Sequence, residues 1–183
     1  MSESSRIIQY QPADLAEPVE LVSAIRARRG GQLINLDRML LHSTPFARGW
    51  NAFLKEVREN LSLDARLREL AMCGVAVLNG ADYEYLHHAP VYLAAGGSQA
   101  AIEMLRHWES SQFDPSLFDA LELSALALTK MMTRDIQVPD ALMLQLKREL
   151  GEEALVELVG VIATYNMVSR FLVALKVTPE HHP

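Results

Sequence analysis

Cysteine is almost missing from this sequence, which has one, Cys73, in 183 residues. A single cysteine can neither close an intrachain disulfide nor form a Cys-x-x-Cys motif. We expect Cys73 to be buried and unreactive, because apolar residues surround it and the carboxylate of Glu69, four residues earlier, would raise a thiol's pKa. The alternative interpretation is a nucleophilic thiol.

Clustered positive charge and long apolar runs are also scarce. The net charge is −6, and the basic residues are scattered apart from Arg26, Arg28 and Arg29, so the sequence does not predict a nucleic-acid-binding face. We interpret this cluster as the solvated, dipole-matched end of a helix. No run approaches 18 uninterrupted apolar residues, and the first residues lack the apolar core of a secretory signal. We therefore expect a cytoplasmic protein that does not span a membrane.

Strand patterns are missing as well, because no stretch alternates apolar and polar residues over six positions between turn signals. Helix signals are dense instead. Pro45 follows two residues that can cap a helix, and Asn79-Gly80 ends an apolar-periodic segment because both residues tolerate positive φ. The last segment, about residues 152–176, is apolar on most sides and is predicted to be central or at a subunit contact. The sequence predicts an all-α single-domain bundle of seven to nine helices.

The candidate chemistry is concentrated in residues 69–88, which predict a helix, a tight turn and a second helix. Glu84 and His88 are four residues apart and therefore share a helix face. A carboxylate beside an imidazole holds its tautomer and raises its basicity. The pair is a candidate general acid–base, and the alternative is an ordinary pair on a solvated helix face.

A second carboxylate, Glu69, lies on the helix before the turn. Its neighbour Leu70 faces the core by period, so Glu69 could be partly buried and act as an acid or base. The alternative is an exposed glutamate paired with Arg66 or Arg68.

A metal site is a weaker possibility. Glu84 and His88 could supply two ligands, but no clear third ligand follows, and the side chains of His87 and His88 diverge because they are adjacent. The sequence has no His-Glu-x-x-His motif. We expect neither a metal nor another cofactor.

Polar residues also interrupt the last apolar segment. Tyr165-Asn166 stands within it, and Arg170 follows. Because buried polar groups need partners, these residues could clamp the bundle together, or they could line a pocket and bind an anionic substrate.

Together these motifs resemble the carboxymuconolactone decarboxylase family, which also includes alkylhydroperoxidase D. The resemblance covers roughly residues 30–177 and rests on the following segments: Leu67-Arg68-Glu69-Leu70, Asn79-Gly80, Tyr83-Glu84-Tyr85-x-x-His88, Ala95-Gly96 and Tyr165–Arg170. It implies an alkylhydroperoxidase D-like helical domain at 31–177, after an extension with one helix at 1–30 and before a tail at 178–183. It also implies homo-oligomers (dimers, trimers or hexamers) with sites near subunit contacts.

The sequence departs from the peroxidase branch of that family. The pattern that the resemblance implies for this branch is Glu-x(11)-Cys-x-x-Cys-x-x-x-His. Counted from Glu69, the two cysteine positions hold Ala81 and Glu84, while the histidine position holds His88. A thiol peroxidase needs a thiolate to attack the peroxide and usually a second thiol to resolve the product. We therefore disfavour peroxidase or peroxiredoxin activity.

The decarboxylase branch implies a cofactor-free lyase or proton-transfer enzyme acting on a small organic acid. In this interpretation His88 donates or accepts the proton, Glu84 orients the His88 ring, and Glu69 is a second acid or base. The candidates for substrate binding are Tyr83, His87 and Arg170. Two alternatives remain: a thiol peroxidase that relies on Cys73, and a non-catalytic oligomer that binds a small molecule or has a structural role.

Overall fold

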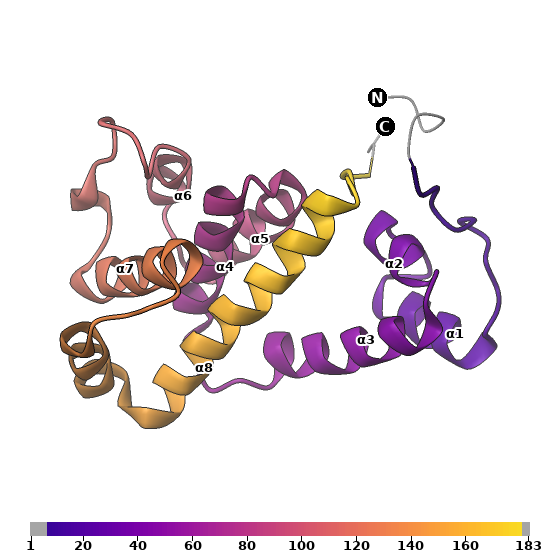
Figure 1. Ribbon diagram of the computed structural model, residues 1–183, viewed down its shortest axis with the longest axis horizontal. Helices are drawn as coiled ribbons and strands as arrows, with labels where there is room; N and C mark the ends of the chain where they lie inside the picture. The colour runs from indigo at the N-terminus through magenta and orange to yellow at the C-terminus, as the bar shows by residue number, and fades with distance from the viewer. Residues whose placement is uncertain (1–6, 181–183) are drawn as a thin grey trace. The chain divides into compact units, whose positions relative to one another are not determined.

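Helices form nearly all the regular structure of residues 7–180, which are the residues that the computed structural model describes (Figure 1). Within them lie eight α-helices, one short 3-10 helix and no strand. The all-α class expected from the sequence is therefore confirmed. The ends of the predicted N-terminal extension and tail, residues 1–6 and 181–183, lie outside the described part of the chain.

The helices divide into two compact units, one formed by residues up to Asn60 and from Ala174 onward, the other by Leu61–Val173. The first unit contains α1 (Val19–Arg28), α2 (Asn35–Leu40) and α3 (Thr44–Glu59). Pro45 occupies the first turn of α3 as predicted, where its missing N–H costs no hydrogen bond.

The arginine cluster of the first unit is less solvated than expected. Arg26 and Arg28 lie in the last turn of α1, where cations complement the helix dipole. Arg29 and Arg28 also reach Asp37, with N···O distances of 3.2 and 3.7 Å, and Asp37 is only 1% exposed. Two of the three arginines thus balance a buried carboxylate. The order of charged residues along the sequence does not reveal this pairing.

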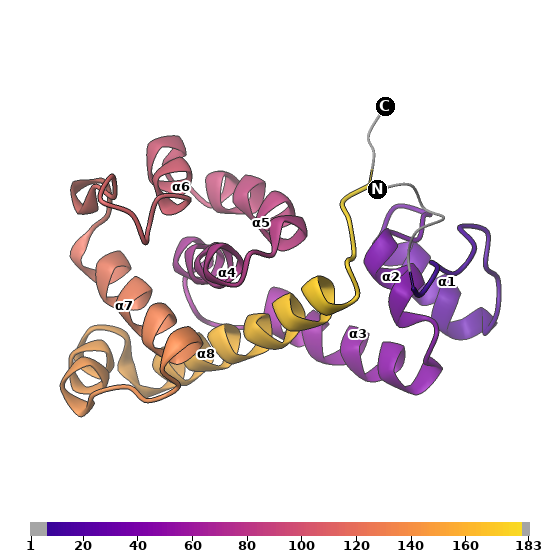
Figure 2. The ribbon, with the colours of Figure 1, turned by 45° about the horizontal axis from the view of Figure 1, so that its top comes forward.

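The second unit is built around α4 (Ala65–Asn79), which packs against α5 (Asp82–Ala94), α6 (Gln99–Leu105) and α7 (Ala120–Arg134). Figure 2 shows α4 nearly end-on, with these helices and α8 around it. Ten residues of α4 are buried. Gly74 lets its neighbours come close, because a Cβ there would lie 3.1 Å from the Trp108 ring.

The last helix, α8 (Asp140–Ala174), breaks at Gly151, whose φ is +82°. The sequence predicted that the last segment starts just after this glycine, at about residue 152. The helix is long and apolar enough to cross a membrane, but half of its most apolar window is buried, as in the central helix of a folded bundle. The expectation that the protein does not span a membrane stays a prediction.

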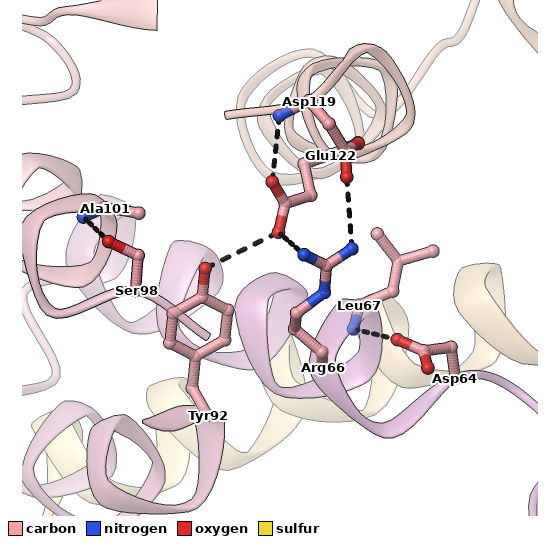
Figure 3. Close-up of polar contacts among 8 residues, drawn as sticks. All are labelled: Asp64, Arg66, Leu67, Tyr92, Ser98, Ala101, Asp119 and Glu122. Atoms are coloured by element: carbon pink, nitrogen blue, oxygen red, sulfur yellow. Dashed lines mark hydrogen bonds and ion pairs between the residues drawn. The ribbon is translucent and has the colours of Figure 1, made fainter. Parts of the chain in front are cut away.

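A polar network joins the start of α4 to the start of α7 (Figure 3). Asp119 and Glu122 form a reciprocal capping box at the N-terminus of α7. Arg66 lies 3.0 Å from Asp119 and 3.5 Å from Glu122. The hydroxyl of Tyr92, on α5, donates to Glu122 Oε1 at 3.5 Å. Three helices of the second unit therefore meet at this network.

Candidate active site

A sharp corner between α4 and α5 positions the candidate site. Gly80 ends α4 in the left-handed conformation with φ +64°, and the Ala81 N–H donates to Ala76 O at 2.8 Å. A residue with a side chain would be strained there. The corner is the tight turn that Asn79-Gly80 predicted. It packs α5 against α4 and brings residues from distant turns face to face.

Glu69 of α4 and His88 of α5 meet across this corner. The Nδ1 atom of His88 lies 2.6 Å from Oε2 of Glu69. Glu69 is 2% exposed, and the side chain of His88 is 12% exposed. The burial expected as one possibility for Glu69 is thus observed, and water screens this pair only weakly.

The contact adds a partner that the sequence did not assign to His88. We expected Glu84 to orient His88 because the two share a helix face; the carboxylate at Nδ1 is Glu69, and the role of Glu84 stays a prediction. The other oxygen of Glu69 lies 3.4 Å from Arg68 Nε. Arg66, the other cation considered for Glu69, instead joins the network at the start of α7.

Glu84 is also buried, at 2% exposure, and belongs to a second contact. Ser169 of α8, which is fully buried, donates its hydroxyl to Glu84 Oε2 at 2.5 Å. Sequence reasoning missed Ser169. Its only signal was its place one residue before Arg170 in the segment that resembles the family, and no local spacing links it to Glu84.

An aromatic ring fixes the other side of the imidazole. Tyr165 of α8 is fully buried, and its ring meets the His88 ring edge-on, with centroids 4.8 Å apart. Edge-to-face packing of this kind holds two rings at a preferred angle. His88 is thus held by a carboxylate from α4 and a ring from α8.

The thiol of Cys73 lies near the same carboxylates but is inaccessible. Cys73 is fully buried, as expected. Burial raises the pKa of its thiol far above the ordinary range, and the charges of Glu69 and Glu84 raise it further. A thiol in this state does not supply a thiolate at neutral pH.

The three residues proposed to bind substrate take part in contacts within the protein. The rings of Tyr83 and His87 are stacked with centroids 4.3 Å apart, and His87 Nδ1 lies 2.7 Å from the Tyr83 carbonyl oxygen. Arg170 Nη1 donates to Asn166 Oδ1 at 2.7 Å, and the Asn166 amide donates to Thr133. Asn166 therefore links α8 to α7, and Arg170 contacts Asn166 within α8. The substrate-binding roles stay predictions.

The arrangement suits acid–base chemistry by His88 and its carboxylate partner. Within residues 7–180, no group of three or more His, Cys, Asp or Glu side chains is placed to hold a metal ion. What the site offers is an imidazole with a fixed carboxylate partner, in a largely apolar surrounding.

Comparisons with known proteins identify the fold and a family that part of the chain matches. Residues 44–126 match the model of the carboxymuconolactone decarboxylase family. No curated protein sequence matches the chain. Among solved structures, an uncharacterized peroxidase-related protein from Silicibacter sp. TM1040 is 18% identical, with a TM-score of 0.74 over 95% of each chain.

Two further structures share the fold. A protein of unknown function from Agrobacterium tumefaciens, related by its description to the antioxidant defence protein AhpD, is 18% identical with a TM-score of 0.69, covering 79% of this chain and 97% of that one. A cysteine-to-alanine variant of the debrominase Bmp8, in complex with 2,3,4-tribromopyrrole, is 16% identical with a TM-score of 0.75, covering 96% and 94%. Residues 44–126 thus resemble the carboxymuconolactone decarboxylase family, and the described chain shares the fold of these solved structures.

Proposed function

We propose that this protein is a cofactor-free enzyme that moves a proton on a small organic acid, with His88 as the catalytic acid–base. The observation that carries the proposal is the 2.6 Å contact between His88 Nδ1 and the buried carboxylate of Glu69. Glu69 is then a positioning residue. The match of residues 44–126 to the carboxymuconolactone decarboxylase family model supports a lyase of the decarboxylase kind, and proteins with this fold differ in activity.

The Glu69 contact determines which ring nitrogen does the chemistry. A carboxylate at Nδ1 favours the tautomer with its proton there and stabilises the imidazolium form. Proton exchange with a substrate would then pass through Nε2. The edge contact with Tyr165 fixes the plane of the ring, so Nε2 has one direction in which to act.

Decarboxylation is the reaction that best uses such a group. The bond between the carboxylate carbon and the adjacent carbon breaks, carbon dioxide leaves, and the electron pair remains on the substrate as an enolate. His88 then delivers the proton from Nε2 to carbon, and a proton from water restores the imidazolium. An apolar surrounding favours the first step because it stabilises the spread charge of the enolate relative to a localised carboxylate.

A thiol peroxidase is the disfavoured alternative. Its two thiol positions hold Ala81 and Glu84, and Cys73 is buried with a pKa raised by burial and by two carboxylates. The debrominase among the similar structures suggests a useful contrasting probe, a brominated pyrrole.

The experiment measures carbon dioxide release from carboxymuconolactone and from a panel of β-keto and lactone acids, with hydrogen peroxide and 2,3,4-tribromopyrrole as contrasting substrates. We expect release from at least one acid, its loss in His88→Gln, and its retention in Cys73→Ala and in the control His107→Gln, which alters an exposed histidine. Peroxide consumption that disappears in Cys73→Ala, or a ligand bound equally by unmodified and His88→Gln protein without turnover, would refute the proposal.

A further inference from the structure

A buried carboxylate beyond the Glu69–His88 pair belongs to the same part of the protein. Glu84 stands four residues before His88 on α5, and residues at this spacing lie about 6 Å apart between Cβ atoms. Glu69 and Glu84 both act on the thiol of Cys73 through their charge. Both carboxylates therefore lie within electrostatic range of the same residue of α4.

Burying a carboxylate is costly unless charges or hydrogen bonds compensate it. The hydroxyl of Ser169 supplies one such bond to Glu84, and a hydroxyl donor favours the ionised carboxylate over the neutral acid. Both partners are at most 2% exposed, so water contributes little to this balance.

The groups around His88 come from three helices. Glu69 and Tyr165 contact its ring, and the other ionisable side chains in this part of the unit are Arg68 and Cys73 of α4, Glu84 and His87 of α5, and Arg170 of α8. Among these, Arg170 is already bonded to Asn166 and Cys73 keeps its proton. Glu69 contacts the ring, Arg68 contacts Glu69 at 3.4 Å, and Glu84 lies one helical turn before His88 on α5.

We propose that Glu84, held by Ser169, is a second carboxylate of the His88 site, and that its negative charge keeps His88 protonated in the resting protein. Ser169 is a positioning residue in this account. With the imidazolium present, Arg68 and His88 balance Glu69 and Glu84, so the cluster is neutral. With a neutral imidazole the cluster would carry one uncompensated negative charge in an apolar surrounding, which is unfavourable.

This inference rests on the proposed function and deepens it. A resting imidazolium is the acid that the enolate needs after carbon dioxide has left. A neutral cluster also admits an anionic substrate, which a site with a net negative charge would repel. The position that holds a thiol in the peroxidase pattern thus carries a charge that sets the state of the histidine.

The test is a titration of the histidine ring nitrogens by NMR in the full-length protein, between about pH 5 and pH 9. His88→Gln identifies the His88 signals, and the other histidines serve as internal references. We expect the His88 midpoint to lie above the ordinary value of about 6.5 and to fall by about one pH unit in Glu84→Gln, since the carboxylate charge is lost. A midpoint at or below the ordinary value, or one unmoved by Glu84→Gln, would overturn the proposal.

Ser169 is tested in the same titration. Ser169→Ala should lower the His88 midpoint by less than Glu84→Gln does, while Ser169→Thr, which keeps a hydroxyl, should leave it in place. In a Glu84→Gln background, Ser169→Ala should have no further effect. An equal shift in both backgrounds would show that Ser169 acts by another route and would overturn its role.

The control is Ser124→Ala, which removes a serine hydroxyl of α7 that donates to the Ala120 carbonyl and accepts from Gln145 of α8. It should leave the His88 midpoint unchanged. Because the titration needs no substrate, it separates the two proposals. The expected midpoints without any carbon dioxide release would refute only the decarboxylase function, whereas release with unmoved midpoints would refute only the role of Glu84.

Discussion

Glu69 and His88 stand 19 positions apart and meet at 2.6 Å because one glycine turns α4 back along α5. The contact joins a buried carboxylate to an imidazole at the edge of the core. Such a pair holds the ring in one tautomer and one orientation, which is what general acid–base catalysis requires. The first prediction concerns the carboxylate.

Glu69→Gln keeps the size of the side chain and removes its charge. We expect kcat for the decarboxylated acid to fall about 100-fold, because the imidazolium loses its partner, while KM changes little. Steady-state kinetics would measure both constants. An unchanged kcat would show that the His88–Glu69 contact is only structural, and Arg66→Gln, at the polar network of α7, is the control for removing a partly buried charge from α4.

Cys73 should be unreactive while the protein is folded. Its thiol is buried and its pKa is raised by burial and by the charges of Glu69 and Glu84, so almost no thiolate forms at pH 8. Labelling with a disulfide reagent should therefore be slow in buffer and fast after unfolding in guanidinium. Rapid labelling of the folded protein would contradict the burial that disfavours a peroxidase.

Gly97→Ala should destabilise the protein by about 1–3 kcal/mol through overpacking. A Cβ at this position would lie 2.2 Å from the ring of Tyr92, which is buried and bonded to Glu122. Urea unfolding would measure the change. Gly160→Ala is the matched control, because nothing lies within 4 Å of a Cβ there and alanine favours the helix. Equal stability of the two variants would contradict the packing.

Glu157 should contribute stability that depends on pH. Burial tends to raise its pKa, but hydrogen bonds from the Ser62 N–H, the Ser62 hydroxyl and the Leu63 N–H, together with the charge of Arg68, outweigh burial and lower it. Because the pKa is lower in the folded than in the unfolded state, the contribution is present above about pH 4.5 and disappears as the pH falls below that value.

Urea unfolding of unmodified protein and Glu157→Gln would test this dependence. At pH 7 we expect the variant to be less stable by about 1 kcal/mol, the scale of a lost charge-assisted hydrogen bond, and the difference to vanish at low pH. Glu153→Gln, at an exposed position, should show no difference. A difference that grows toward low pH would contradict the assignment.

The sequence predicted the helices and the corner of this fold well, because both depend on local signals. Pro45 and Gly80 set their own backbone conformations, and the apolar periodicity of α4 is visible without any partner. The site was only partly predictable. Helical spacing pointed to Glu84 as the partner of His88, but the choice of Glu69 depends on how two helices pack, which no local spacing encodes.

Ser169 shows the same limit more strongly. It lies 85 positions from Glu84, on a helix whose apolar pattern gives no sign that one face carries a hydroxyl toward a carboxylate. Asp37 shows the same limit, because its buried carboxylate is compensated by Arg29, a partner that only the fold reveals. The role of a buried polar residue depends on its hydrogen-bond and ion-pair partners, which only the folded chain brings together.

The most direct test of the central claim is solvent isotope incorporation during turnover. When an acid substrate is decarboxylated in heavy water, we predict one deuterium at the carbon that lost carbon dioxide, delivered by His88 through Nε2. The single-turnover rate of this incorporation should fall at least about 100-fold in His88→Gln. Incorporation at the same rate in the variant and the unmodified protein would contradict the role of His88 as the proton donor.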